Sequence, residues 1–149
     1  MNTKTSGVQI VLPQHCNGYA KPRLFGGQIM AWIDVIGAVA ARRYAKRAVT
    51  TVCVDHLTFI APAFLNDTVV QEAVVTWAGR TSLEVRVDSF VEQLDGQRRM
   101  VNRAYVVYVA LDENDQPAPV PPFQPEGEEE QREFEAALER RRIRLGQSI

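Results

Sequence analysis

Residues 24–41 form a long apolar segment in which Gln28 and Asp34 carry the only polar side chains. A helix that is apolar on every side belongs in the interior of a fold. A carboxylate is costly to bury unless it is paired or hydrogen-bonded, so Asp34 needs a structural or chemical reason to be there. The segment predicts a buried central helix, from about Gly26 to Lys46, with a candidate functional residue in its middle.

After this helix the apolar pattern changes to the two-residue alternation of β-strands. Strands are expected at residues 7–13, 49–59, 68–77, 82–92 and 97–111. The strand at 82–92 alternates cleanly, which predicts one buried face and one face in water. The last strand is apolar on both faces at 105–109, so it is either central in the sheet or covered by another subunit. One apolar helix and one antiparallel sheet predict an α+β fold in which the sheet curls around the helix.

The end of the chain has a different composition. Residues 116–125 carry five prolines and read as an extended linker. Residues 128–145 are highly charged and predict a solvated helix, with a narrow apolar stripe formed by Phe134, Leu138 and Leu145. We therefore expect a domain over residues 1–121 and a charged, helical tail over 122–149, lying on the domain surface or binding a partner.

The composition excludes several classes of function. A formal charge of −1 lacks the basic excess of a nucleic-acid-binding protein. Two histidines and two cysteines, without clustered ligands, argue against a metal site or a disulfide framework. Asp34 and three glycines argue against a membrane span at 24–41, so the expected location is the cytoplasm. One 149-residue chain cannot cover both the helix and a two-sided apolar strand, which predicts self-association.

Four residues around the helix are candidates for chemistry. Gly26 and Gly27 at its start leave backbone amides open, which suits an oxyanion as well as close packing. Asp34 is a candidate general base, or a buried carboxylate paired for structural reasons. A rise of 1.5 Å per residue places Asp34 roughly 10 Å from Gly27. A substrate whose carbonyl meets the Gly27 amide would then reach Asp34 only through an intervening atom, or Asp34 would come from a second subunit. Asn17, on the preceding loop, is able to orient a water or to serve as a turn residue.

Other polar pairs in the sequence carry weaker signals. Asp55 and His56 are neighbours on one strand and are expected to point to opposite faces, which excludes a side-by-side pair. His15 and Cys16 are expected to pack in a loop. The turn at 79–82 offers the cation of Arg80 and the hydroxyls of Thr81 and Ser82. It is suited to a phosphate or a pantetheine amide, but an ordinary hairpin needs no ligand.

Several of these segments match one known family in order along the chain. They are residues 15–18 (HCNG), 23–34 (RLFGGQIMAWID), 52–59 (VCVDHLTF), 79–82 (GRTS), 102–105 (NRAY) and 109–113 (VALDE). Together the segments resemble the hotdog-fold acyl-CoA thioesterases of the bacterial cytosolic acyl-CoA hydrolase type. The resemblance covers roughly residues 8–121 and leaves the charged tail outside it.

The resemblance implies a five-stranded antiparallel sheet around one long helix, assembled edge to edge as a dimer and often as a hexamer. It implies hydrolysis of acyl-CoA without a cofactor, with Asp34 activating water or attacking the thioester. The amide of Gly27 would polarise the carbonyl, and Asn17 would position the reacting groups from the other subunit. Gly26, Arg80, Thr81 and Ser82 would contact CoA.

Two points leave alternatives open. The loop between Asn17 and Gly26 is about two residues longer than the family pattern, and Lys21-Pro22 replaces small residues there. The same fold would also serve a non-catalytic acyl-CoA sensor or scaffold, or a hydratase or dehydratase that uses an Asp/His pair. The sequence does not reveal the preferred acyl chain length or any regulation by nucleotides.

Overall fold

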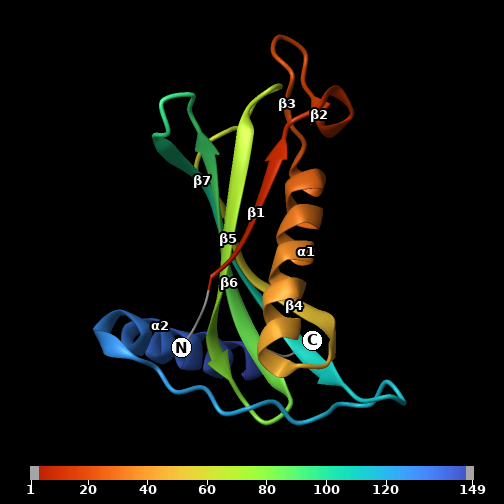
Figure 1. Ribbon diagram of the computed structural model, residues 1–149, viewed down its shortest axis with the longest axis vertical. Helices are drawn as coiled ribbons and strands as arrows, with labels where there is room; N and C mark the ends of the chain where they lie inside the picture. Colours follow the sequence, from red (N-terminus) through yellow and green to blue (C-terminus); the bar gives the residue numbers. More distant parts are fainter. Residues whose placement is uncertain (1–3, 147–149) are drawn as a thin grey trace.

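The computed structural model describes residues 4–146, which form one main sheet and two long helices (Figure 1). The elements are, in order, β1 (Thr5–Ile10), a 3-10 turn (Pro13–His15), β2 (Cys16–Asn17), β3 (Arg23–Leu24), α1 (Gly26–Ala45), β4 (Ala48–Phe59), β5 (Thr68–Ala78), β6 (Ser82–Glu92), β7 (Arg98–Leu111) and α2 (Gly127–Leu145). The last three residues of the predicted tail lie outside the described part of the chain.

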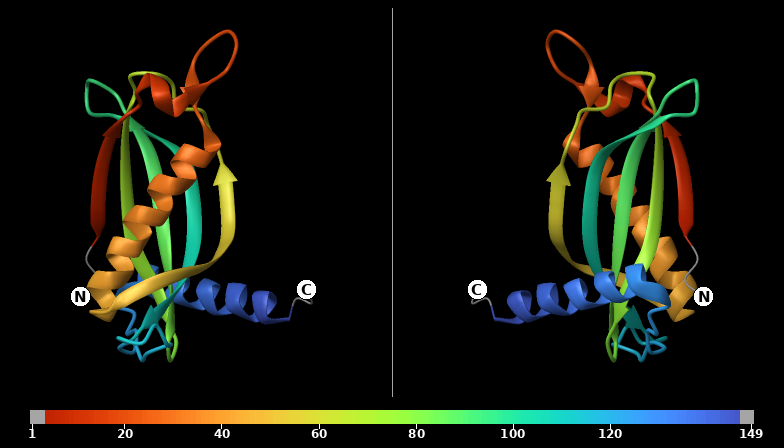
Figure 2. Two further views of the ribbon diagram at one scale, coloured as in Figure 1. Left: turned by 90° about the vertical axis from the view of Figure 1, so that its right-hand side faces the viewer. Right: turned by 90° about the vertical axis from the view of Figure 1, so that its left-hand side faces the viewer.

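The main sheet has the strand order β1-β5-β6-β7-β4, and every neighbouring pair is antiparallel. It curves around α1, which lies along its concave face (Figures 1 and 2). The predicted α+β arrangement of five strands around a central helix is therefore confirmed. β7 lies between β6 and β4, which explains why its sequence is apolar on both faces.

Helix α1 buries a single stripe against the sheet. Ile29, Ile33, Gly37, Ala40 and Ala41 are buried along it, at the spacing of one helical face. They join the fully buried side chains of the sheet interior, such as Val85, Val87 and Val106. The helix ends at the predicted place, because Lys46 adopts a left-handed φ of 56° and its amide bonds to the Arg42 carbonyl at 2.7 Å.

The prediction that α1 is buried on every side is wrong for a single chain. Val35 is 65% exposed, and Met30 is also exposed. The strand β4, which packs beside α1, is an edge of the sheet and exposes the apolar side chains of Val52, Val54 and Phe59. One chain therefore leaves apolar side chains of both the helix and this edge strand uncovered.

The first strand and the loop after it also differ from the prediction. β1 ends at Ile10 rather than Pro13, because its register with β5 runs out where Ile10 pairs with Thr68, the first residue of β5. The loop expected before the helix contains the 3-10 turn and a small hairpin in which Asn17 pairs with Arg23. This hairpin lies at the end of the molecule where α1 begins (Figure 1).

The polar face of β6, expected in water, is in fact covered by α2. Glu84 is 1% exposed and receives two hydrogen bonds from Arg140 of α2, at 2.7 and 3.0 Å. Arg86 bonds to Glu133 of α2 at 2.9 Å. Helix α2 thus lies across the convex face of the sheet, opposite α1 (Figure 2).

The tail agrees with the prediction in form and differs in its contacts. Residues 116–125 contain no helix or strand, and the predicted helix spans Gly127–Leu145. Phe134 of the expected apolar stripe stacks on Phe123 at 5.8 Å, whereas Leu138 and Leu145 are exposed. Ion pairs from the helix to the sheet take the place of the rest of the stripe.

Candidate active site

Asp34 lies in the middle of α1, on the side that faces β4 and β7. Its Oδ1 accepts a hydrogen bond from the Thr51 hydroxyl of β4 at 2.7 Å. The Tyr108 hydroxyl of β7 lies 3.2 Å from the same oxygen and 2.9 Å from the Asp34 backbone carbonyl. Within residues 4–146, Oδ2 makes no hydrogen bond. The carboxylate is therefore anchored through one oxygen, and the other oxygen is left available to a ligand.

Tyr108 is fully buried between the sheet and α1. Burial, and then the negative charge of Asp34, raise the pKa of the phenol well above its usual value. The hydroxyl therefore stays protonated and remains a hydrogen-bond donor. The charge of Asp34 is held by two neutral donors, so its surroundings differ from the apolar burial that the sequence suggests.

The start of α1 offers backbone amides beside an open groove. The amides of Gln28 and Ile29 bond back to the Phe25 carbonyl at 3.0 and 3.2 Å, whereas Gly26 and Gly27 begin the first turn, whose amides have no acceptor one turn back in the helix. A groove of about 430 Å³ opens here. It is lined by Arg23, Leu24, Gly26, Phe59, Ile60, Ala61 and Pro62. Apolar walls, one cation and a helix N-terminus suit an acyl chain and a polarised carbonyl.

The predicted catalytic residues fall into two places within one chain. Asn17 is exposed on the β2–β3 hairpin, at the same end of the molecule as Gly27 (Figure 1). Asp34 lies two helical turns further on, roughly 10 Å from Gly27 along the axis. One chain therefore brings Asn17 and Gly27 to one end and leaves Asp34 on the open face between α1 and β4.

The predicted CoA-binding turn lies at the other end of the molecule. Arg80, Thr81 and Ser82 connect β5 to β6, and Ser82 pairs with Val109 near the end of β7. The carbonyls of Arg80 and Thr81 accept bonds from Val120 and Ala110, both at 2.9 Å. The turn is thus supported by the linker, and one chain does not bring it to the Gly27 groove.

The prediction that Asp55 and His56 point to opposite faces is wrong. The register of β4 against β7 shifts between Val54 and His56, and this bulge brings His56 Nδ1 within 3.4 Å of Asp55 Oδ1. The Asp55 carboxylate also accepts a hydrogen bond from Arg144 of α2 at 2.6 Å. Asp55 therefore lies beside α2, on the face of the sheet opposite Asp34, while the His56 side chain is exposed.

His15 and Cys16 pack as expected in the loop. The Leu12 amide donates to His15 Nδ1 at 3.0 Å, the His15 ring contacts Trp32 edge-on, and Cys16 Sγ lies 3.5 Å from the Leu12 carbonyl. Over residues 4–146 no group of three His, Cys, Asp or Glu side chains has the arrangement of a metal site. Neither helix in that range is long and apolar enough to cross a membrane.

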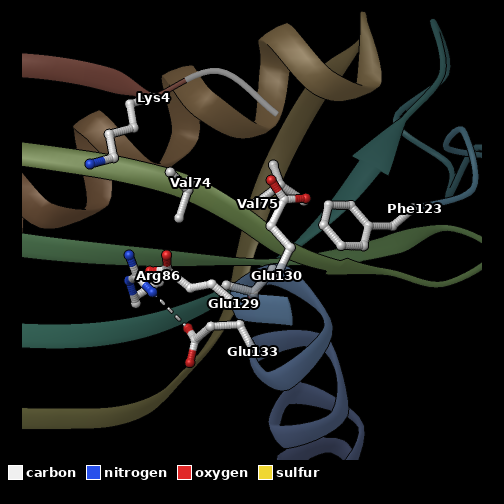
Figure 3. A pocket seen from close by; sticks show the side chains of 9 residues that line it. Lys4, Val74, Val75, Arg86, Phe123, Glu129, Glu130 and Glu133 are labelled. Carbon is white, nitrogen blue, oxygen red and sulfur yellow. Dashed lines mark hydrogen bonds and ion pairs between the residues drawn. The ribbon is translucent and has the colours of Figure 1, made fainter. Parts of the chain in front are cut away.

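A smaller cavity of about 190 Å³ lies between the convex face and the start of α2 (Figure 3). It is lined by Lys4, Val74, Val75, Thr76, Arg86, Phe123, Glu129, Glu130 and Glu133. Its charged groups are partly paired with one another, as in the Arg86–Glu133 bond drawn in Figure 3. The sheet separates this cavity from Asp34.

Sequence reasoning missed Thr51 and Tyr108. A hydroxyl on a β-branched or aromatic residue within a strand looks like ordinary strand composition, so neither carries a local signal. Gly37 is an indirect sign of Tyr108, because the lack of a side chain at this position leaves room for the Tyr108 hydroxyl against the packed face of the helix. Arg23 in the groove was part of the matched segments but was given no role.

The chain matches the model of the thioesterase superfamily over residues 22–95. It is 32% identical over 116 residues to the acyl-CoA thioester hydrolase YciA of Salmonella typhimurium, covering 75% of this chain and 86% of that protein. It is 34% identical over 145 residues to mouse acyl-coenzyme A thioesterase 11, covering 96% of this chain. The chain spans about a quarter of the length of that mouse relative, 24%.

Solved structures of high similarity share the whole fold. An acyl-CoA hydrolase of Staphylococcus aureus, in complex with butyryl-CoA and CoA, has a TM-score of 0.87 and 31% identity, covering 95% of this chain and 86% of that one. Its structure is also known with single asparagine, aspartate or threonine residues replaced by alanine. A hexameric thioesterase of Yersinia pestis has a TM-score of 0.71 and 30% identity, covering 78% and 93%.

The family match, the identity over most of a bacterial hydrolase and the shared hotdog fold agree with one another. The chain belongs to the acyl-CoA thioester hydrolase family of the thioesterase superfamily.

Proposed function

We propose that this protein hydrolyses acyl-CoA: water and the thioester give a carboxylic acid and the free thiol of CoA. The observation that carries the proposal is the Asp34 carboxylate, which is anchored through Oδ1 by Thr51 and Tyr108, while Oδ2 makes no hydrogen bond within residues 4–146. The family relationship and the apolar groove at the start of α1 support it.

Two routes use the same carboxylate. As a general base, Asp34 takes a proton from water while the water oxygen forms a bond to the thioester carbon. As a nucleophile, it forms an acyl anhydride that water then opens. In both routes the carbon–sulfur bond breaks and the sulfur leaves as thiolate, which takes up a proton. Oxygen-isotope incorporation into Asp34 during a single turnover distinguishes the nucleophilic route.

The negative charge that develops on the carbonyl oxygen needs donors, and we assign the Gly27 amide to it. The positive end of the helix dipole favours this charge. Asp34 and Gly27 of one chain are too far apart to share a carbonyl, so we propose a site built from two subunits. In this arrangement Asn17 and Gly27 of one chain work with Asp34 of its partner.

Thr51 joins this site as a further residue. The aspartate and threonine replaced in the Staphylococcus aureus hydrolase are separated by the same 17 positions as Asp34 and Thr51. The asparagine replaced there is two positions closer to that aspartate than Asn17 is to Asp34. This difference corresponds to the longer loop after Asn17, and it supports Asn17 as the equivalent residue.

We propose that β4 is the edge through which two chains pair. It is 12 residues long, whereas the other edge, β1, has 6. Thr51, which holds Asp34, is part of this strand. Three such dimers would form a hexamer like that of the Yersinia pestis thioesterase. In the assembly the Arg80–Ser82 turn of another chain would be free to hold CoA together with Gly26.

The setting that fits these roles is the cytoplasm and its lipid metabolism, without a metal or redox cofactor. Cys16 and Cys53 are free thiols in the structure, which is compatible with a reducing compartment. The Asp55–His56 contact gives no support to a hydratase, because Arg144 and α2 occupy that carboxylate on the convex face. The division at residues 121 and 122 stays a prediction.

The direct test is release of free thiol from acyl-CoA substrates of increasing chain length by the purified protein. We expect turnover above the uncatalysed rate with at least one chain length, without added metal and in the presence of chelator. Binding of acyl-CoA with no thiol release at any length would favour the sensor or scaffold and contradict the proposal.

A further inference from the structure

The hydroxyl of Tyr108 contacts two oxygens of the same residue. It lies 2.9 Å from the backbone carbonyl of Asp34 and 3.2 Å from Oδ1 of its side chain. A donor placed between these two atoms restricts rotation of the Asp34 side chain about its own bonds. Tyr108 itself is held in place by complete burial in the close-packed interior.

The second donor to Asp34 is held less firmly. Thr51 is an exposed residue of the edge strand β4, and the register of that strand shifts directly after it. Within one chain, Thr51 ties Oδ1 to a strand that has no neighbour on its outer side, so this donor is fixed only once a second chain pairs with β4. The buried phenol therefore supplies the part of the anchor that does not depend on assembly.

Gly37 makes the contact possible. A Cβ atom at this position would lie 2.3 Å from the Tyr108 hydroxyl and 3.2 Å from its Cζ. Glycine is unfavourable in the middle of a helix relative to alanine, so its presence there needs a reason. The close approach of the phenol to the helix is that reason, and it links a helix residue to a strand residue distant in the sequence.

We propose that Tyr108 is a positioning residue for the reaction, which aims Oδ2 of Asp34 at the substrate, and that Gly37 is required because it leaves room for the phenol. This rests on the proposed hydrolysis with Asp34 as its reactive group. The phenol contacts neither water nor thioester in this role. It fixes the direction of the carboxylate, on which the rate depends steeply.

The first test is Tyr108→Phe, which keeps the ring and removes the hydroxyl. We expect kcat for acyl-CoA hydrolysis to fall about tenfold or more. KM should change less than about twofold, because the groove at the start of α1 is untouched. Tyr105→Phe is the matched control on the same strand: its hydroxyl faces Glu133 of α2, so its kcat should equal that of the wild type.

The second test is a double-mutant cycle with Gly37→Ala. The added methyl group displaces the hydroxyl in the wild type, so Gly37→Ala alone should lower kcat about as far as Tyr108→Phe. With the hydroxyl removed, the nearest atom is Cζ at 3.2 Å, which a small shift accommodates. The double variant should therefore be no slower than the slower single variant.

The outcomes separate this proposal from the proposed function. Two results would overturn the positioning role while leaving hydrolysis intact. One is a wild-type kcat in Tyr108→Phe. The other is a double variant whose loss of kcat is the product of the two single losses. Full activity in Asp34→Asn would instead overturn the proposed mechanism. Thermal unfolding and native mass of each variant show whether a loss of kcat occurs in folded, assembled protein, as the positioning role requires. A loss of kcat that appears only with unfolding or loss of assembly contradicts it.

Discussion

Asp34 illustrates how a charge is kept in an apolar helix. The side chain sits on the open side of α1, and hydroxyls from two different strands satisfy one of its oxygens. Both donors are neutral hydroxyls, and within residues 4–146 no ion pair to Asp34 is found. Such an arrangement suits a base or nucleophile, because a salt bridge would hold the charge more tightly.

The first prediction concerns Thr51. Thr51→Val keeps the shape of the side chain and removes the donor to Oδ1, so we expect kcat to fall about tenfold, since a hydrogen bond to a charged group contributes about 1.5–3 kcal/mol. Thr51→Ser should retain most of the rate. Thr50→Val, next to it on the strand, is the control. Equal rates for Thr51→Val and Thr50→Val in the thiol-release assay would remove Thr51 from the site.

At this scale the sequence revealed some residues and concealed others. Asp34 could be found because a carboxylate within an apolar segment violates the local pattern. Thr51 and Tyr108 could not, because their hydroxyls are compatible with any strand and their partner is distant in the sequence. The error on Asp55 and His56 has a similar cause: the bulge that brings them together depends on the register with β7.

At the scale of elements, α2 is held to the sheet by charges. Arg140 binds Glu84 through two hydrogen bonds and lies over the Tyr105 ring at 3.7 Å. Arg144 binds Asp55 at the edge strand. These contacts explain how a helix with such a charged sequence packs on the sheet. Burial of paired charges does not by itself stabilise a fold, but loss of one partner is costly.

The second prediction follows from the pairing of Glu84. Arg140→Ala leaves this almost fully buried carboxylate without its cation, so we expect the free energy of unfolding to fall by about 3 kcal/mol. Arg142→Ala is the matched control on the same helix, because its partner Glu139 is exposed and its loss should have no measurable effect. Urea unfolding of both variants compares them. Equal midpoints would contradict the role of the ion pair.

Periodicity predicted α1 and the strands after it to within a few residues, because each has a strong local pattern. It misread the polar face of β6 as solvated. Alternation indicates which face is polar but not whether a distant helix covers it. The ion pairs of Glu84 and Arg86 with α2 join segments about 50 residues apart, and no local window contains both partners.

At the scale of the whole molecule, one chain leaves apolar side chains uncovered. They lie on α1, at Met30 and Val35, and on the free edge strand β4, at Val52 and Val54. Exposed apolar surfaces of this kind mark sites of association. The sequence predicted self-association from burial alone, whereas the strand order identifies the two edges that are free to pair, β1 and β4.

The third prediction tests this edge. Val54→Glu places a charge on the exposed edge strand β4, and like charges from two chains would meet across a two-fold interface. We expect the native mass to fall to that of one chain and the hydrolysis rate to fall with it, because the proposed site uses two subunits. Leu94→Glu, at the fully exposed tip of the β6–β7 hairpin, is the control and should keep the native mass. An assembled Val54→Glu variant with full activity would contradict the role of β4.

The most direct test of the whole account is the hydrolysis rate of Asp34→Asn beside the wild type. Asparagine keeps the size and the acceptor oxygen for Thr51 and Tyr108, so the fold should survive, while the group that takes up a proton or attacks the carbonyl is gone. We expect free-thiol release to fall at least about a thousandfold, with unchanged native mass and unfolding temperature. Thiol release at the wild-type rate by the folded variant would contradict the central role of Asp34.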